Sequence, residues 1–367
     1  MTTNSARPNV VVESLSPHVR SLASVEHVRV DPTLHRLQWN ESPFDFPPEL
    51  KEEVMQRLAQ AEWSRYPVTL RPFDLIDRLA ATLGVPADRI AMTGGSSDMI
   101  RVLFAALVQP GDAVVMPSPT FLLYRRNARL HGADLLEVPC DAERDFALPV
   151  DDLIVAARTN QAKVVVLCAP NNPTGTVFPV AHLAQLVEEC GCPVVIDEAY
   201  QEFSGQDLLS LASRHANVVL VRTFSKAFSM AGVRLGYAVA AAPVISELQK
   251  VITAFPLSLF TEIVAAVALE NRVRFMQGVA QVVAERERLA AALAELPGVR
   301  VHSSGTNFLL VRPNVPARPI FEHLFRAHHL LISDAGGYPE LDNYLRISVG
   351  TPEENDLVVR GFRECVG

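Results

Sequence analysis

Short apolar runs that are rich in β-branched residues recur along much of the chain, with segments of helical character between them. Five of them are continuously apolar: RIAMTGG (89–95), DAVVMPSPT (112–120), KVVVLCAP (163–170), CPVVIDEAY (192–200) and NVVLVRTFSK (217–226). Continuous apolar strands are typical of a parallel sheet that is covered on both faces. The alternation of strand and helix therefore predicts an α/β fold with a central, mostly parallel sheet.

The pattern changes after residue 260. The segment 261–296 predicts a long helical region that ends at the sequence LPGV. NFLLV (307–311) and YLRISVG (344–350) then predict strands of a smaller α+β unit. A chain of 367 residues also exceeds the ~250 to 300 residues at which a single core stops growing. We therefore expect a large α/β domain and a second, smaller α+β domain.

Composition excludes several classes of protein. Hydrophobic residues make up 49% of the chain and charged residues 20%, which is typical of a globular protein. A net charge of -8 argues against a nucleic-acid partner. No apolar stretch reaches the ~18 residues of a membrane span, and the N-terminus lacks the apolar core of a signal peptide. We expect a cytoplasmic protein that binds neither nucleic acid nor membrane.

The five cysteines have no spacing typical of a secreted disulfide framework, which also favours a reducing compartment. Cys190 and Cys192 flank one glycine, but no second cluster completes a zinc motif, so core packing is the favoured interpretation. His328 and His329 are adjacent rather than at the spacing of metal ligands, and the sequence therefore predicts no metal.

Polar residues gather where the apolar runs end. The sequences SPTF, APNNPTG, DEAY and RTFSK each follow a predicted strand. Open α/β sheets bind their ligands at the carboxyl ends of their strands. These four segments therefore predict one shared site.

Lys226 is the most unusual residue in these segments, because small and apolar residues surround it in RTFSKAFSMAGVRLGY (222–237). A buried lysine must be neutralised or paired. Asp197, at a neighbouring strand end, is a carboxylate whose burial is costly without a positive partner. A Schiff base between Lys226 and an aldehyde cofactor would meet the first need. Pyridoxal phosphate supplies that aldehyde together with a pyridine nitrogen that pairs with a carboxylate.

Seven motifs in order carry a family resemblance: RYP, TGGSSD, SPTFLLY, APNNPTG, DEAYQEF, RTFSKAFSMAGVRLGY and LRISVGTPEEN. From about Asn40 to its C-terminus, the chain resembles the histidinol-phosphate aminotransferases, which are fold-type I pyridoxal-phosphate enzymes. The resemblance implies an N-terminal segment (1–45) that packs with the small domain or a partner subunit, a large cofactor-binding domain (46–260) and a small C-terminal domain (261–367). It also implies a homodimer.

The resemblance assigns roles around the cofactor ring. Lys226 matches the Schiff-base lysine, which also moves the proton between the substrate Cα and the cofactor C4′. Asp197 matches the partner of the pyridinium nitrogen. Asn172 and Tyr200 match the donors to the phenolate oxygen, and Phe121 matches the aromatic residue that stacks on the ring.

A second set matches the contacts of the cofactor phosphate. The backbone N–H groups of Ser96 and Ser97 begin a predicted helix, where geometry and dipole favour an anion. Ser225 and Arg234 would complete this site. Tyr66 resembles the tyrosine that reaches the phosphate from the neighbouring subunit.

The substrate side of the resemblance is incomplete. Arg346 matches the arginine that holds a substrate carboxylate or its counterpart in histidinol. Thirteen residues earlier, where the family usually has an arginine that helps bind histidinol phosphate, this chain has Ser333. Loss of such a charge-assisted contact costs roughly 1.5 to 3 kcal/mol. We therefore expect an aminotransferase that uses an amino acid or amino alcohol and a 2-oxo acid, with glutamate and 2-oxoglutarate as one pair and with reduced recognition of histidinol phosphate.

Three other functions are alternatives to amino transfer. A pyridoxal-phosphate decarboxylase or lyase shares the same cofactor contacts, and the sequence does not show which Cα bond is broken. A cofactor-sensing regulator would need a DNA-reading domain, for which the residues before the similarity are too few and not basic enough. A hydrolase is disfavoured because the chain has no GxSxG and no HExxH.

Overall fold

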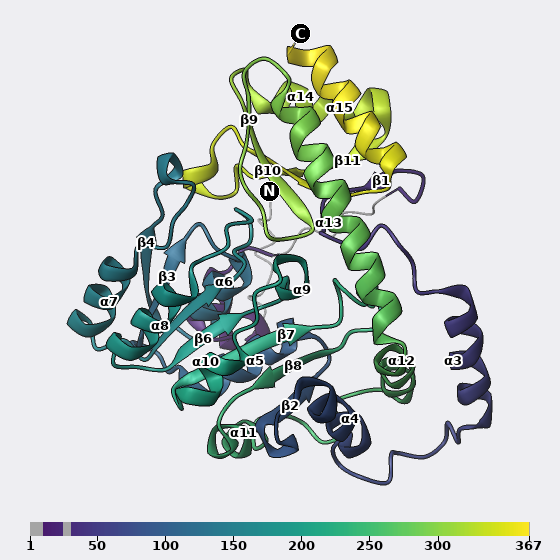
Figure 1. The fold of residues 1–367 in the computed structure, drawn as a ribbon. Helices are drawn as coiled ribbons and strands as arrows, with labels where there is room; N and C mark the ends of the chain where they lie inside the picture. The colour runs from purple at the N-terminus through teal and green to yellow at the C-terminus, as the bar shows by residue number, and fades with distance from the viewer. Residues whose placement is uncertain (1–9, 25–30, 367) are drawn as a thin grey trace, which may run out of the picture.

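The computed structural model describes residues 10–24 and 31–366. A large unit built on one sheet carries a smaller unit above it, and the long helix α13 (Arg272–Ala294) runs between the two (Figure 1). No helix in these described ranges is both long and apolar enough to cross a membrane.

The central sheet has seven strands in the order β2-β8-β7-β6-β5-β3-β4. β8 is antiparallel to both its neighbours, and all other neighbours are parallel. The predicted α/β architecture is thus confirmed. The strands are β2 (Ile90–Thr93), β3 (Ala113–Ser118), β4 (Asp134–Pro139), β5 (Val164–Cys168), β6 (Val194–Asp197), β7 (Val218–Thr223) and β8 (Gly236–Val239).

Helices cover both faces of this sheet, which explains why its strands are apolar throughout. Within β5, Val165 and Leu167 pack into one core with α4, α7, α8, α10 and α12, whereas Val164 and Val166 pack into another with α5, α6 and α11. The elements of the large unit are α3 (Pro48–Gln60), α4 (Phe73–Leu83), η1 (Ala87–Arg89), α5 (Ser96–Leu107), α6 (Leu122–Leu130), η2 (Ala142–Arg144), α7 (Val150–Thr159), α8 (Val180–Glu189), α9 (Gln201–Ser204), α10 (Leu209–Arg214), α11 (Ala242–Leu248) and α12 (Leu259–Glu270).

The smaller unit is an antiparallel sheet of order β12-β13-β10-β9 with helices packed on it. Its elements are β9 (Val299–Val301), β10 (Phe308–Pro313), α14 (Ala317–His328), β11 (Leu330–Leu331), β12 (Ser333–Asp334), η3 (Pro339–Leu341), β13 (Leu345–Ser348) and α15 (Pro352–Val366). The strands predicted at 307–311 and 344–350 are β10 and β13.

The N-terminal segment contacts both units. β1 (His35–Arg36) pairs with β11 of the smaller unit, whereas α2 (Pro17–Ser21), which follows α1 (Val10–Ser14), lies against α6 of the large unit. The domain boundaries at residues 45 and 260 stay predictions.

One predicted element is divided in the structure. The helical region 261–296 is two helices, α12 and α13, which meet at Asn271. The side-chain amide of Asn271 donates to the carbonyl of Val267 at 2.9 Å, which satisfies an acceptor at the end of α12. An asparagine side chain that hydrogen-bonds the backbone in this way competes with the regular helix, which favours a break at this position.

Candidate active site

A cavity of about 290 Å³ lies at the carboxyl ends of the central strands, with Arg346 of the smaller unit in its wall. Ten of the eleven predicted site residues line it, and the exception is Tyr66. The ten are Ser96, Ser97, Phe121, Asn172, Asp197, Tyr200, Ser225, Lys226, Arg234 and Arg346.

Lys226 lies three residues beyond β7, with its amine inside the protein. Its Nζ donates to the main-chain carbonyl of Trp39 at 2.8 Å. Burial is the main cause that lowers the pKa of Lys226 to about 8, and the positive charge of Arg346 adds to it. A large part of this amine is therefore neutral near pH 8 and able to act as a nucleophile or a base.

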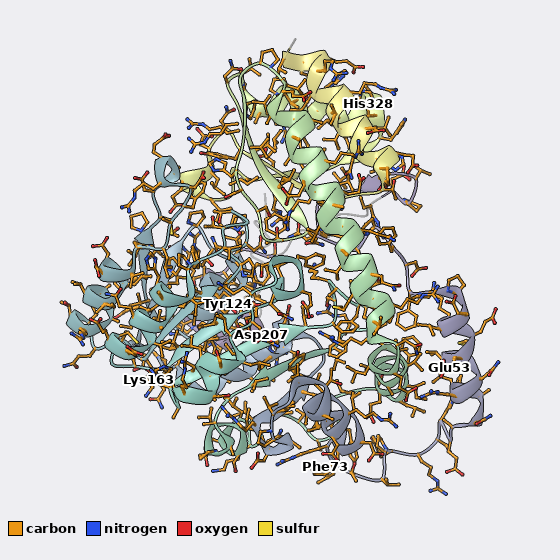
Figure 2. The ribbon with its side chains drawn as sticks, viewed as in Figure 1. Glu53, Phe73, Tyr124, Lys163, Asp207 and His328 are labelled. Atoms are coloured by element: carbon orange, nitrogen blue, oxygen red, sulfur yellow. The ribbon has the colours of Figure 1, made fainter. Side chains whose placement is uncertain are left out.

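Asp197 ends β6 and is almost fully buried. Its Oδ2 accepts from the hydroxyl of Tyr124 at 2.9 Å, and its Oδ1 accepts from the backbone N–H of Ala199 at 3.0 Å. Tyr124 is among the residues labelled in Figure 2. Burial raises the pKa of Asp197 to about 6, although both hydrogen bonds oppose the shift. The carboxylate is held in one orientation and lacks a positive partner close enough to offset its burial.

Arg346 joins the smaller unit to the cavity. From β13, its Nη1 donates to Oδ1 of Asn172 at 2.7 Å and its Nη2 donates to the carbonyl of Gln38 at 2.7 Å. Its guanidinium lies 5.4 Å from the ring centre of Phe308, and its buried Nε has no hydrogen-bond partner. Its guanidinium therefore places a fixed positive charge in the wall of the cavity, which favours an anion there.

Tyr200 stands beside this group, at the start of α9. Its hydroxyl accepts from the side-chain amide of Asn40 at 2.9 Å, and burial raises its pKa. Tyr200 thus carries its proton at neutral pH and can donate it to an acceptor in the cavity.

The other end of the cavity lies at the N-terminus of α5, beside Arg234. Ser96 and Ser97 begin α5 after Gly95, whose φ of 104° favours glycine. A Cβ on Gly95 would lie 2.6 Å from Nη2 of Arg234, and one on Gly236 would lie 2.1 Å from the backbone nitrogen of Ser96. Gly95 therefore lets the guanidinium approach the start of α5, and Gly236 lets β8 approach the same helix start.

Tyr66 lies outside the cavity of its own chain. Its side chain is 78% exposed, and its ring stacks on Phe255 with ring centres 4.6 Å apart. Trp63, Val68 and Leu70 in the same loop are also exposed. An apolar loop of this size on the surface is typical of an interaction site.

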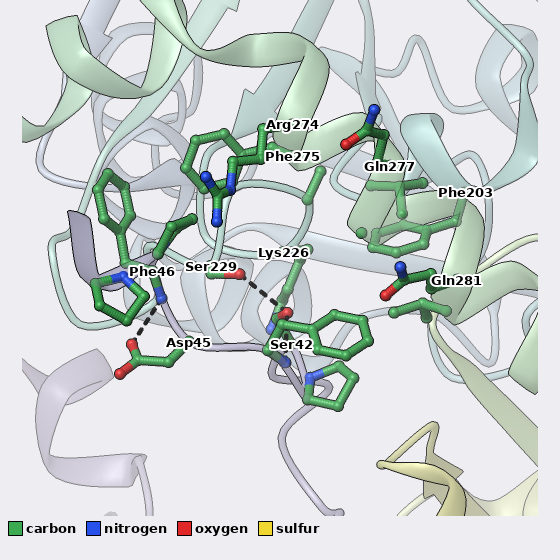
Figure 3. Close-up of a pocket in the computed structure, with 18 residues that line it drawn as sticks. Ser42, Asp45, Phe46, Phe203, Lys226, Ser229, Arg274, Phe275, Gln277 and Gln281 are labelled. Carbon is green, nitrogen blue, oxygen red and sulfur yellow. Dashed lines mark hydrogen bonds between the residues drawn. The ribbon is translucent and has the colours of Figure 1, made fainter. Parts of the chain in front are cut away.

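A second cavity of about 530 Å³ reaches Lys226 from another side (Figure 3). The loop that carries Ser42 and Asp45 forms one wall, and α13 forms another with Phe275 and Gln281. Ser229 donates to Oγ of Ser42 at 3.0 Å, which joins this loop to the segment after the lysine.

Sequence reasoning missed three residues that hold the site together: Tyr124 beside Asp197, Trp39 beside Lys226, and Asn40 beside Tyr200. Tyr124 could have been found, because it lies one helical turn after Phe121 within SPTFLLY. The contact of Trp39 uses only its backbone carbonyl, which any residue supplies.

Known proteins match this chain over most of its length. The family described as aminotransferase class I and II matches residues 33–362. The histidinol-phosphate aminotransferase of Chlorobaculum tepidum is 38% identical over 88% of this chain and 92% of its own length. That of Sinorhizobium meliloti, solved in complex with pyridoxal-5'-phosphate, has a TM-score of 0.85 and 24% identity over 96% of this chain and 97% of its own. The L-threonine-O-3-phosphate decarboxylase of Porphyromonas gingivalis shares the fold, with a TM-score of 0.78 and 22% identity over 90% of this chain and 98% of its own.

Proposed function

The chain belongs to the class I and II aminotransferases and uses pyridoxal phosphate, and we propose that its amino substrate is an α-amino acid without a side-chain phosphate. The second substrate pair is glutamate and 2-oxoglutarate. The observation that carries this choice is the pairing of Ser333 with Arg346 across β12 and β13. Arg346 can hold one anionic group of a substrate, such as an α-carboxylate, but Ser333 offers no second positive charge for a phosphate.

The cavity suits the cofactor at each of its ends. We propose that Asp197 holds the pyridine nitrogen and that Phe121 stacks on the ring. Asn172 and Tyr200 would contact the ring oxygen. The phosphate would take the start of α5, Ser225 and Arg234. When bound, pyridoxal phosphate supplies an electron sink next to the substrate Cα.

Lys226 would have two roles in the reaction. Its neutral amine would hold the cofactor at the aldehyde carbon, and the same Nζ would act as the base that moves the proton at the substrate Cα. A pKa of about 8 places this amine near the range that suits a general base.

The lowered pKa of Lys226 gives a pH-dependent result. Because the neutral amine is the reactive form, the rate at which the protein without cofactor bonds pyridoxal phosphate should rise with pH and level off above about 8. An amine with the usual pKa of 10.5 would be only roughly 0.3% neutral at pH 8. Stopped-flow absorbance at constant ionic strength measures the rate. A rate that keeps rising tenfold per pH unit up to pH 10 would contradict the assignment.

Ser333 gives a prediction about the choice of substrate. The wild-type protein should exchange its amino group readily with phosphate-free amino acids and poorly with histidinol phosphate. Ser333→Arg places a second guanidinium beside Arg346, and we expect it to lower KM for histidinol phosphate about ten- to a hundredfold. Half-reactions followed by cofactor absorbance, one amine at a time, measure the substrate preference of the wild type and the effect of Ser333→Arg on histidinol phosphate.

Ser333→Gln is the matched control, because it adds length without charge. Efficient turnover of histidinol phosphate by the wild type would refute the proposed substrate. Release of carbon dioxide without amino transfer would instead favour the decarboxylase.

We also propose a cytoplasmic homodimer in which Tyr66 reaches the phosphate site of the partner subunit. The exposed apolar loop around Tyr66 supports the dimer, and the five free cysteines suit a reducing compartment.

Mixed dimers test the position of Tyr66. Lys226→Ala and Tyr66→Ala subunits are each expected to be impaired, but their hybrid contains one site with both residues intact. Statistical mixing should restore about a quarter of wild-type activity. If Tyr66 serves the site of its own chain, mixing will restore nothing beyond the sum of the two variants.

A further inference from the structure

A group of three potential metal ligands lies on the smaller unit, far from the cavity described above. His323 and His328 come from α14, and Glu364 comes from α15. Figure 2 labels His328, where these two helices lie side by side. We propose that these three side chains bind one zinc ion.

The two imidazoles converge on one oxygen. Nε2 of His323 lies 2.7 Å from Oε2 of Glu364, and Nε2 of His328 lies 2.8 Å from the same atom. The three ligand atoms lie within 4.8 Å of one another. The side chain of His328 is only 10% exposed, whereas those of His323 and Glu364 are 35% and 44% exposed. The group is therefore anchored on one side and open to an ion and water on the other.

Two imidazoles and one carboxylate are a typical zinc ligand set, with water in the fourth position. Tetrahedral zinc with bonds of about 2.0 to 2.1 Å separates its ligand atoms by about 3.3 Å. The observed separations of 2.7 and 2.8 Å therefore need to widen by about 0.6 Å. Rotation of the half-exposed Glu364 side chain can supply this movement. Nitrogen ligands also disfavour magnesium and calcium.

The packing of α14 on α15 brings the ligands together. A Cβ on Gly361 would lie 2.5 Å from Cδ2 of Leu324 and 3.0 Å from Cδ2 of His328. Glycine at this position lets the two helices approach, one turn before Glu364. The second imidazole is His323, whereas His329, which is adjacent to His328 in the sequence, ends the helix at a φ of 55°.

Zinc at this position would link the last turns of both helices. The ion would replace the two hydrogen bonds to one carboxylate with three coordinate bonds and would stabilise the smaller unit. It takes no part in amino transfer, because none of its ligands lines the active-site cavity.

The test is zinc titration of the holoenzyme, saturated with pyridoxal phosphate and free of amino acids, against a chromophoric chelator. We expect one equivalent to bind and to raise the thermal midpoint, and an equal amount of magnesium to have no effect. Glu364→Gln and His323→Gln should each weaken zinc binding by at least about tenfold. Because both side chains are partly exposed, the two variants are expected to fold.

Two controls separate this site from other zinc ligands. His215→Gln alters a histidine–glutamate pair in which Nε2 of His215 lies 3.6 Å from Oε1 of Glu188; this pair offers a metal two ligands rather than three. Cys192→Ser removes a thiol near Cys190. Both should bind zinc like the wild type. Binding that survives Glu364→Gln, binding that is lost with Cys192→Ser, or no stoichiometric binding would each overturn the proposal.

Discussion

Lys226→Ala is expected to lower kcat for amino transfer by about 10⁴-fold, the upper end of the range for a positioned base. On the proposed assignment, alanine removes the one amine that would both bond the cofactor and move the proton. The proposed phosphate contacts and Asp197 are unchanged, so the variant should still bind pyridoxal phosphate, now without a covalent bond. Borohydride treatment followed by mass spectrometry measures the bond, and steady-state kinetics with glutamate measure the rate.

Lys226→Arg is the matched control because it keeps the positive charge but has no nucleophilic amine at neutral pH. It should be as inactive as the alanine variant, which would show that nucleophilicity matters rather than charge. Borohydride labelling at a different lysine in the wild-type protein would contradict the assignment.

The strands of the fold could be read from the sequence where burial on both faces made them continuously apolar. β5 and β6 are buried at every position, and both lie inside predicted runs. β4 was missed because it lies at the edge of the sheet, where its residues are exposed or half-buried and the sequence DLLEVP gives no such run. β8 was missed because it has only four residues and its first two are the end of the motif RTFSKAFSMAGVRLGY, so no separate apolar run marks it.

The site could be predicted in outline because strand ends meet at one edge of a sheet. The hydrogen bonds that join the site residues to distant parts of the chain could not be predicted in the same way. Arg346 contacts Asn172, 174 residues away, and Lys226 contacts a backbone carbonyl 187 residues away. Such contacts depend on how the smaller unit and the N-terminal segment sit on the sheet, which no local pattern encodes.

Burial moves the two key ionisable groups in opposite directions. The pKa of Asp197 is raised to about 6, and that of Lys226 is lowered to about 8, so the protein disfavours both charges. The cofactor suits both groups, since its pyridinium is a partner for the carboxylate and its aldehyde removes the need for a lone ammonium. The unfavourable burial of these groups is thus a property of a site built for a ligand.

Asp197→Asn is therefore expected to have the second-largest effect, a loss of about 10²- to 10³-fold in kcat. Asparagine fills the same space but cannot keep a proton on the cofactor nitrogen, which weakens the electron sink. Binding of the cofactor should fall less than kcat, because the phosphate end is unchanged. Kinetics with glutamate and a fluorescence titration of pyridoxal phosphate separate the two effects.

Tyr124→Phe serves as its control, since it removes one hydrogen bond to Asp197 and leaves the charge. A hydrogen bond to a charged group contributes about 1.5 to 3 kcal/mol when it is lost completely, and the N–H of Ala199 still holds the carboxylate. We expect a loss of about tenfold or less. If Asp197→Asn keeps as much activity as Tyr124→Phe, the carboxylate only positions its neighbours and some other group must hold the proton on the ring.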